Sequence, residues 1–381
     1  MKESTNVFFP NLDGLRFFAF FAVFINHAFV CLGYYNRDKH FEFIRENFLK
    51  NGDIGVSFFF VLSGFLITYL LLKEKETAGK ISITNFYIRR VLRIVPLYYL
   101  VVVLGLYIIP FAINQVPLNF PLNISTSQLN SWYYLTFTGN FDYVYNGVSN
   151  VILGVLWSVS VEEQFYLFWP LVIVFVPRKY LLSCFVLIIM GSTAFRYFYS
   201  EGSAIILKFH SLSCITYLAM GAIIAHLSTK EKIISLMRKL PKYVIVIIYL
   251  VGFGCIPLRL YTWKFGVHYV LLASLVPVLL SAFFAFIIME QNFAEHSFYK
   301  ISRLKTISLL GKYTYGMYCY HMIVFFSVLF VLHIAGMNLS GMNKFAFVSI
   351  SVTSFFATCM VSLLSYHYFE MIFLKLKSKF S

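Results

Sequence analysis

The sequence contains little charge for its length. Of its 381 residues, 12% are charged and only 16 are Asp or Glu, whereas 60% are hydrophobic. Soluble domains average about 25% charged and about 45–50% apolar residues, so this composition excludes a largely water-soluble fold. Apolar runs of about 20 residues, the length of a membrane-spanning helix, recur along the chain. The sequence therefore predicts an all-α integral membrane protein.

Paired cysteines and linkers are also missing. The six cysteines are scattered through apolar segments without a Cys-x-x-Cys pair: Cys31, Cys184, Cys214, Cys255, Cys319 and Cys359. This spacing favours small core residues over disulfides or metal ligands, and we expect no metal site. Because no Gly/Ser-rich linker or charged tail divides the chain, we expect one membrane-embedded domain over 1–381 with no appended soluble domain.

The apolar runs predict about ten transmembrane helices. We expect them near 12–33, 54–73, 93–113, 151–176, 180–199, 209–228, 243–259, 267–290, 312–333 and 344–369. The first run has no small-residue cleavage site, so it reads as a span and not as a removable signal. An even number of spans places both termini on the same side of the membrane.

The distribution of basic residues predicts which side that is. Lys and Arg concentrate in the segments that share a side with the N-terminus, which the positive-inside rule assigns to the cytoplasm. We therefore expect cytoplasmic termini and a multi-pass protein of the inner (plasma) membrane. The net charge of +15 is then explained by loops that face anionic membrane lipid, so nucleic acid is not an expected partner.

The first predicted span carries two ionisable side chains, Arg16 and His27. At about 100° per residue, eleven residues make about three full turns, so the two side chains share a face about 16 Å apart along the axis. Arg16 would lie near the cytoplasm, within reach of Asp13 three residues earlier, and His27 in the outer half. Such residues are costly within a bilayer, and this makes them functional candidates. A snorkelling anchor and a packing histidine are the simpler alternatives.

The fourth predicted span carries two adjacent glutamates, Glu162 and Glu163, in its outer half. A carboxylate near the His27 imidazole could orient the ring and stabilise its charged form. That arrangement suits a general base acting on a hydroxyl. Neighbouring helical residues point about 100° apart, so we expect only one glutamate to enter such a site. An ion pair that fixes helix packing is the alternative.

Three arginines follow the second predicted span on the cytoplasmic side: Arg89, Arg90 and Arg93. Arg89 and Arg93 have the i, i+4 spacing of one helix face. Guanidinium groups bind phosphate in a bidentate manner, so the cluster suits a phosphorylated ligand, although ordinary positive-inside anchoring fits equally well. In the second span, the pair Ser63-Gly64 predicts a close approach of another helix.

One predicted outer loop, 114–150, is long and carries a single charged residue, Asp142. Its Asn, Ser, Thr, Trp and Tyr content suits either a sugar-facing surface or a plain interfacial loop. Asn123 and Asn338 match the N-glycosylation pattern on predicted outer loops. Two further polar positions late in the chain are His321, in the ninth span, and the pair His367 and Glu370 near the inner end of the tenth.

Taken in order, these stretches resemble the bacterial membrane acyltransferase family 3, whose members O-acylate carbohydrates. The similar segments are NLDGLRFFAFFAVFINHA, GDIGVSFFFVLSGFLIT, FYIRRVLRIVPLYY, LWSVSVEEQFYLFWP, YTYGMYCYH and YHYFE. The resemblance implies transfer of an acyl group, acetyl above all, from cytoplasmic acyl-CoA to a carbohydrate or glycoconjugate hydroxyl on the outer side. Acyl-CoA would be a co-substrate, with no permanently bound cofactor, and a separate extracytoplasmic partner protein could complete the route.

The resemblance also implies roles for individual residues. Arg16 and His27 correspond to the family's essential pair, while Glu162 and Glu163 fall on its glutamate motif. The arginine-rich stretch corresponds to the coenzyme-facing loop. His27 would act as general base on the acceptor, or would carry the acyl group covalently. A polysaccharide or lipid-linked sugar transporter is the alternative function, but the paired repeats with broken helices that it predicts are not evident.

Overall fold

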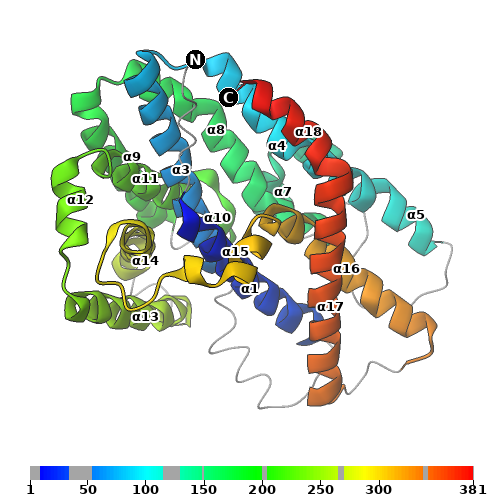
Figure 1. Ribbon diagram of the computed structural model, residues 1–381. Helices are drawn as coiled ribbons and strands as arrows, with labels where there is room; N and C mark the ends of the chain where they lie inside the picture. The colour runs from blue at the N-terminus through cyan, green and yellow to red at the C-terminus, as the bar shows by residue number, and fades with distance from the viewer. Residues whose placement is uncertain are drawn as a thin grey trace. The chain divides into compact units, whose positions relative to one another are not determined.

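The computed structural model describes residues 9–33, 54–114, 129–147, 150–199, 204–264, 270–337 and 342–380. These residues form helices and turns, with no strand among them, so the all-α prediction is confirmed. Figure 1 follows the helices along the chain. The two N-glycosylation matches, at Asn123 and Asn338, fall outside the described residues.

The described residues form a succession of helices. In chain order the main ones are α1 (Pro10–Gly33), α3 (Ile54–Ala78), α4 (Ile83–Val103), α5 (Ile109–Asn114), α6 (Ser131–Leu135), α7 (Gly139–Asn146), α8 (Trp157–Phe175), α9 (Leu181–Tyr199), α10 (Ala204–Phe209), α11 (Ser211–Leu227), α12 (Glu231–Arg238), α13 (Lys242–Lys264), α14 (Val270–Phe293), α15 (Lys305–Gly311), α16 (Thr314–Ile334), α17 (Lys344–Ser365) and α18 (Met371–Lys377). Short 3₁₀ or π turns join several of them: η2 (Leu104–Ile108), η3 (Leu153–Leu156), η4 (Arg178–Tyr180), η6 (Ile301–Arg303), η7 (Tyr366–Glu370) and η8 (Ser378–Phe380).

Among the described residues, eight helical segments are long and apolar enough to cross a membrane, or nine if α12 and α13, bent by 95°, form one span. The chain is therefore a multi-pass membrane protein, with fewer clear spans than the ten expected. The difference lies at α8 and α13. Helix α8 has only 19 residues, and its Glu162, Glu163 and Gln164 make it too polar to count on composition. Helix α13 counts as a membrane span only if it is taken together with α12.

The chain folds as two compact units. Unit 1 contains residues 1–19, 56–87 and 161–311, and unit 2 contains residues 20–55, 88–160 and 312–381. Four helices, α1, α3, α4 and α8, contain residues of both units. Each unit is described below by its own contacts.

In unit 1, α3 and α11 meet at backbone contact through two glycines. A Cβ added to Gly64 would lie 2.0 Å from the carbonyl oxygen of Leu218, and one added to Gly221 would lie 2.1 Å from that of Val61. No side chain fits at either position. The prediction that Ser63-Gly64 permits a close helix approach is thus confirmed, and Gly221 supplies the matching gap on α11.

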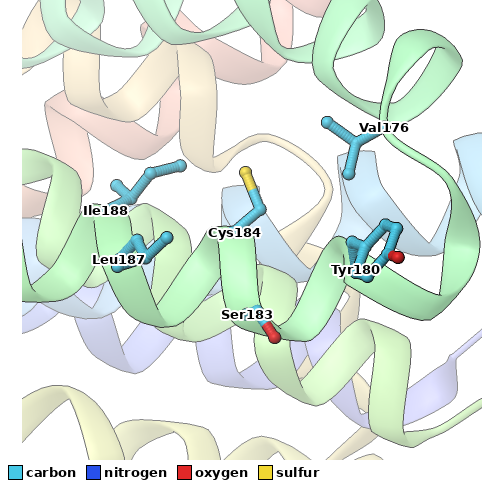
Figure 2. Close-up of a pocket in the computed structure, with 6 residues that line it drawn as sticks. All are labelled: Val176, Tyr180, Ser183, Cys184, Leu187 and Ile188. Carbon is cyan, nitrogen blue, oxygen red and sulfur yellow. The ribbon is translucent and has the colours of Figure 1, made fainter.

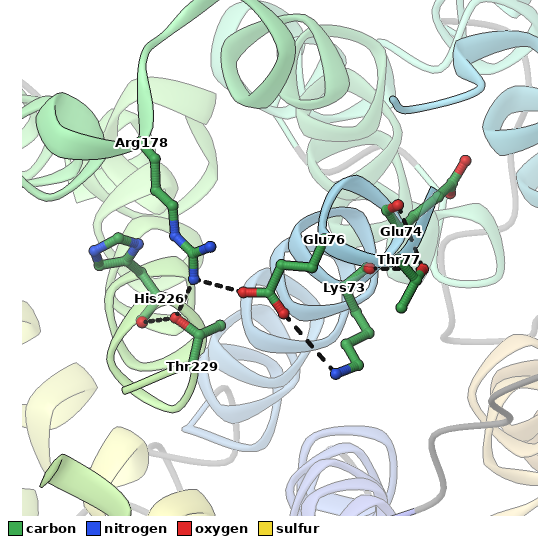
Figure 3. A network of polar contacts seen from close by, with 7 residues as sticks. All are labelled: Lys73, Glu74, Glu76, Thr77, Arg178, His226 and Thr229. Carbon is green, nitrogen blue, oxygen red and sulfur yellow. Dashed lines mark hydrogen bonds and ion pairs between the residues drawn. The ribbon is translucent and has the colours of Figure 1, made fainter. Parts of the chain in front are cut away.

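A polar network joins the ends of three segments at one end of unit 1 (Figure 3). The Nη2 atom of Arg178, in η4, donates to Glu76 Oε1 at 2.5 Å and to Thr229 Oγ1 at 3.0 Å. Lys73 lies 3.9 Å from the other oxygen of Glu76. The sequence predicts that all three segments lie on the cytoplasmic side, and this stays a prediction.

The start of α1 is tied to the end of α14, also within unit 1. Asn11 Nδ2 donates to the carbonyl oxygen of Gln291 at 2.7 Å, and the Ser302 backbone N–H donates to Asn11 Oδ1 at 2.9 Å. Lys300 Nζ donates to the carbonyl oxygens of Glu290 and Gln291, both at 2.8 Å. Burial lowers the pKa of Lys300, although the charge of Glu290 partly offsets this. The bonds from Asn11 and Lys300 satisfy the Gln291 carbonyl group, one of those that a helix end leaves without an intrahelical partner.

Unit 2 is built around α16 and α17, with α6 and α7 packed by polar contacts. Tyr98 of α4 donates its hydroxyl to the carbonyl oxygen of Tyr134 at 2.8 Å, and the Tyr134 hydroxyl donates to Asp142 Oδ2 at 2.9 Å. Burial, with the adjacent carboxylate, raises the pKa of Tyr134. Part of the predicted outer loop is therefore two short helices held by a buried Asp142, while Trp132 and Tyr145 remain exposed.

Candidate functional site

Helix α1 carries the predicted pair on one unbroken helix, as expected. Arg16 lies in its first half, and its Nη1 atom is 2.5 Å from Asp13 Oδ1. The predicted pairing of these two residues is confirmed, and their side chains are 22% and 13% exposed. A partly buried ion pair of this kind keeps the guanidinium in place while leaving part of it accessible.

His27, in the second half of α1, faces a second histidine. Its Nδ1 atom lies 2.9 Å from Nε2 of His321 on α16, and the two rings are nearly parallel, with an interplanar angle of 26° and centroids 5.0 Å apart. His321 Nδ1 in turn lies 2.7 Å from the carbonyl oxygen of Tyr318, one turn earlier on α16. The three groups form a chain of hydrogen bonds within unit 2.

Aromatic and hydroxyl groups hold this chain in place. The edge of Phe20 packs against the His321 ring, with centroids 5.9 Å apart and an angle of 84°. The Tyr318 hydroxyl shares a hydrogen bond of 2.6 Å with Ser158 Oγ and donates to the carbonyl oxygen of Val155 at 3.0 Å. His321 is wholly buried, whereas His27 is partly exposed. The buried member is thus fixed, and the accessible member is the one that a substrate could reach.

Glu162 belongs to a separate hydroxyl network in unit 1. Ser63 Oγ donates to Glu162 Oε1 at 2.7 Å. The Tyr166 hydroxyl lies 3.0 Å from Ser63 Oγ and 3.4 Å from Glu162 Oε2. Hydroxyl donors stabilise the charged form of a carboxylate. Because Glu162 lies in unit 1 and His27 in unit 2, the assistance of His27 by a glutamate, whether Glu162 or Glu163, stays a prediction.

The three predicted phosphate-facing arginines lie on α4 and differ in their surroundings. Arg89 Nη1 donates to the carbonyl oxygen of Phe380 at 2.7 Å, which ties α4 to the end of the chain. Arg93 is exposed and near enough to Glu370 for their charges to interact. Arg90 is partly buried. Nothing in these contacts tests phosphate binding, so this role also stays a prediction.

Sequence reasoning placed His321 within a span but gave it no role, and it missed Tyr318. The available signal was the i, i+3 spacing of the two residues, which puts a carbonyl one turn below an imidazole on the same helix. The partner helix could not be read from the sequence, because His27 and His321 are 294 positions apart. The structure supplies that contact.

A separate cavity of about 500 Å³ lies in unit 1. Figure 2 shows its lining, mostly apolar side chains from the end of α8, η4 and α9. None of the predicted site residues lines this cavity. Among its described lining residues there is no Asp, Glu, His, Lys or Arg. Within the described residues, no cluster of three or more His, Cys, Asp or Glu side chains could hold a metal ion.

Comparison with known proteins assigns the class. A family model described as an acyltransferase domain, acyltransferase family 3, matches residues 9–367, and the chain therefore belongs to that family. The predicted resemblance is confirmed across nearly the whole sequence.

Curated relatives include proteins of Staphylococcus aureus. O-acetyltransferase OatA of strain NCTC 8325 is 35% identical over 177 residues, which cover 45% of this chain and 26% of that protein. A putative O-acetyltransferase of strain COL is 32% identical over 169 residues, covering 44% and 25%. The matches thus span about a quarter of the length of these relatives. No solved structure matches this chain.

Proposed function

We propose that this protein transfers an acetyl group from acetyl-CoA on the cytoplasmic side of the plasma membrane to a hydroxyl of a carbohydrate or glycoconjugate on the other side. The observation that carries the proposal is the ring contact of His27 with His321, 2.9 Å between nitrogens, on a helix whose other half carries the Arg16–Asp13 pair. The names of the relatives, O-acetyltransferases, support the choice of acetyl and of an oxygen acceptor.

In the proposed reaction, His27 is the catalytic residue. Its ring takes the proton of the acceptor hydroxyl while that oxygen attacks the thioester carbon. The new C–O bond forms as the C–S bond breaks, and the coenzyme leaves as a thiolate that recovers the proton from His27. In the covalent variant, the ring nitrogen attacks the thioester carbon first and expels the coenzyme thiolate; the acceptor oxygen then displaces the ring, and the hydroxyl proton passes to the thiolate. Both routes end with the same ester and free coenzyme A.

The remaining predicted residues act around this step. Arg89, Arg90 and Arg93 are proposed to bind the coenzyme phosphates, since guanidinium groups match phosphate geometry. Arg16 is proposed to guide the pantetheine arm along α1 toward His27. A glutamate of α8 is proposed to stabilise positive charge that develops at His27. Membrane lipid surrounds the helices, and a separate extracytoplasmic protein is a further proposed partner.

The test is acetyl transfer or acetyl-CoA hydrolysis by purified protein in detergent or vesicles, with His27→Ala as the variant. A positioned general base contributes about 10²–10⁴-fold, so we expect His27→Ala to lose at least about 100-fold in rate at unchanged protein level. His296→Ala, at an exposed position, is the matched control and should keep full activity. Wild-type rates in His27→Ala would remove His27 from the mechanism, and a wild-type protein that neither turns over nor binds acetyl-CoA would favour a transporter.

Mass spectrometry of surface glycans from cells with and without the gene would identify the acceptor. The expected result is loss of acetyl groups from one class of glycan and their return when the wild-type gene is restored. Restoration by the His27→Ala gene would contradict the proposal.

A further inference from the structure

We infer that His321 is a positioning residue that fixes the tautomer of His27, so that the Nε2 atom of His27 carries the lone pair that does the chemistry. The inference rests on the proposed function for its catalytic meaning, but the tautomer itself follows from the hydrogen bonds. Every group it uses, from His27 on α1 to Tyr318 on α16, lies in unit 2.

The first step is the proton on His321 Nδ1. That atom lies 2.7 Å from the carbonyl oxygen of Tyr318, and a carbonyl oxygen can only accept a hydrogen bond. His321 Nδ1 must therefore carry hydrogen. The Tyr318 carbonyl is held by α16 itself, and the Tyr318 side chain is anchored through Val155 and Ser158, so this acceptor does not move away.

The second step is the state of His321 Nε2. The ring is wholly buried and its edge neighbour is Phe20. Burial among apolar groups disfavours a charged imidazole, so the ring holds one proton, already placed on Nδ1. His321 Nε2 is therefore an acceptor.

The third step is the proton on His27. Its Nδ1 atom lies 2.9 Å from the His321 Nε2 acceptor, so His27 Nδ1 donates and carries the hydrogen. In a neutral imidazole, only one nitrogen carries hydrogen. The lone pair of neutral His27 therefore lies on Nε2, where both the general-base route and the covalent route require it.

The arrangement also explains why a neutral histidine suits this position. When His27 gains a proton on Nε2, its Nδ1 hydrogen still donates to His321 Nε2, so the ring does not have to turn during the reaction. The hydrogen bond made by one ring nitrogen of a histidine sets which nitrogen carries the proton. In this protein, His27 is oriented by the His321 ring, which is itself fixed by its hydrogen bond to the Tyr318 carbonyl oxygen of α16.

The direct test is nuclear magnetic resonance of protein labelled with ¹⁵N at histidine, with the His27→Gln spectrum used to assign the His27 signals. We expect wild-type His27 to show a protonated Nδ1 and an unprotonated Nε2. A protonated Nε2 in neutral His27 would overturn the inference. This measurement needs no activity, so it decides the tautomer even if the proposed acetyl transfer proves wrong.

The kinetic test compares His321→Leu, which removes the acceptor, with His321→Gln, whose side-chain oxygen can replace it. We expect His321→Leu to lose about 100-fold in kcat with little change in KM for acetyl-CoA, and His321→Gln to recover at least about tenfold of that loss. These values lie within the range of a positioned base. Met322→Leu, a buried and volume-conserving change on the same helix, should leave kcat unchanged.

Two kinetic outcomes would contradict the positioning role. One is a wild-type kcat in His321→Leu. The other is an equal loss in the Leu and Gln variants at equal yields of folded protein. If neither variant folds, the wild-type resonance spectrum still decides the tautomer. If His27→Ala is active while the spectrum shows the expected tautomer, the proposed catalysis fails and the hydrogen-bond assignment stands.

Discussion

Two of the predicted functional residues, Glu162 in unit 1 and His27 in unit 2, are satisfied in different ways. In unit 1, Glu162 accepts a hydrogen bond from Ser63 and lies near the Tyr166 hydroxyl, and such donors favour a negative charge. In unit 2, His27 meets the ring of His321, which favours a neutral ring whose lone pair lies on Nε2. The first arrangement suits electrostatic stabilisation, and the second suits proton transfer or nucleophilic attack.

The groups also differ in what holds them. Ser63 sits beside Gly64, where α3 touches the backbone of α11, so the carboxylate network depends on a close contact between two helices. The histidine pair depends on the Tyr318 carbonyl, which belongs to the same helix as His321. We therefore expect the glutamate network to be sensitive to helix packing and the histidine pair to be sensitive to loss of an acceptor.

The largest expected effect comes from Gly64→Ala. A Cβ at this position would lie 2.0 Å from the Leu218 carbonyl oxygen, and backbone cannot rotate away as a side chain can. Overpacking costs about 1–3 kcal/mol and occasionally more, so we expect a loss of about 3 kcal/mol in unfolding free energy. The matched control is Gly191→Ala on α9, where a Cβ meets nothing within 4 Å. Equal thermal stability of the two variants in detergent would contradict this account of the contact.

The next effect is that of Glu162→Gln, which keeps the shape of the side chain and removes its charge. If the carboxylate stabilises positive charge at His27, kcat should fall about 10- to 100-fold, equivalent to about 1.4–2.7 kcal/mol. Glu163→Gln is the matched control, since neighbouring residues point about 100° apart on a helix. We expect a smaller loss there, and a larger loss in Glu163→Gln would assign the role to the other glutamate.

Several of these features could be predicted from the sequence because they depend on local spacing or composition. The apolar runs gave the helices, the i, i+3 spacing gave the Asp13–Arg16 pair, and small residues gave the α3 contact at Gly64. A helix was also predicted where α8 forms, although Glu162 and its polar neighbours lower the hydropathy of this otherwise apolar segment.

The contacts that could not be predicted join distant parts of the chain. His321 was visible as a histidine in a span, but its approach to His27 depends on how α1 and α16 pack. The same holds for the bond from Arg89 to the carbonyl oxygen of Phe380, a partner that sequence spacing cannot indicate. Spacing along one helix reports which residues share a face, and only tertiary packing decides what that face meets.

A moderate effect is expected for Ser63→Ala, which removes a donor to Glu162. An intramolecular hydrogen bond contributes about 0.5–1.5 kcal/mol, and bonds to charged groups contribute about 1.5–3. Because the Tyr166 hydroxyl already lies 3.4 Å from Glu162 Oε2 and can take over part of the role, we expect a loss of about 1 kcal/mol in unfolding free energy. Ser327→Ala, which removes an exposed hydroxyl that donates to the Ile323 carbonyl oxygen on the same helix, should cost less. A loss in Ser63→Ala no greater than in this control would show that Ser63 does not support the carboxylate.

The smallest effect is expected at the Arg178–Glu76 pair in Figure 3, whose side chains are 51% and 31% exposed. Exposed ion pairs contribute about 0.2–1 kcal/mol, since water screens them and ordering two long side chains costs entropy. A double-mutant cycle with Arg178→Ala and Glu76→Ala should give a coupling energy in that range, falling as salt is raised. A coupling well above 1 kcal/mol that persists in high salt would mean that this end of unit 1 is shielded from water. Ion pairs would then contribute to helix packing in unit 1 alongside the backbone contact of α3 with α11.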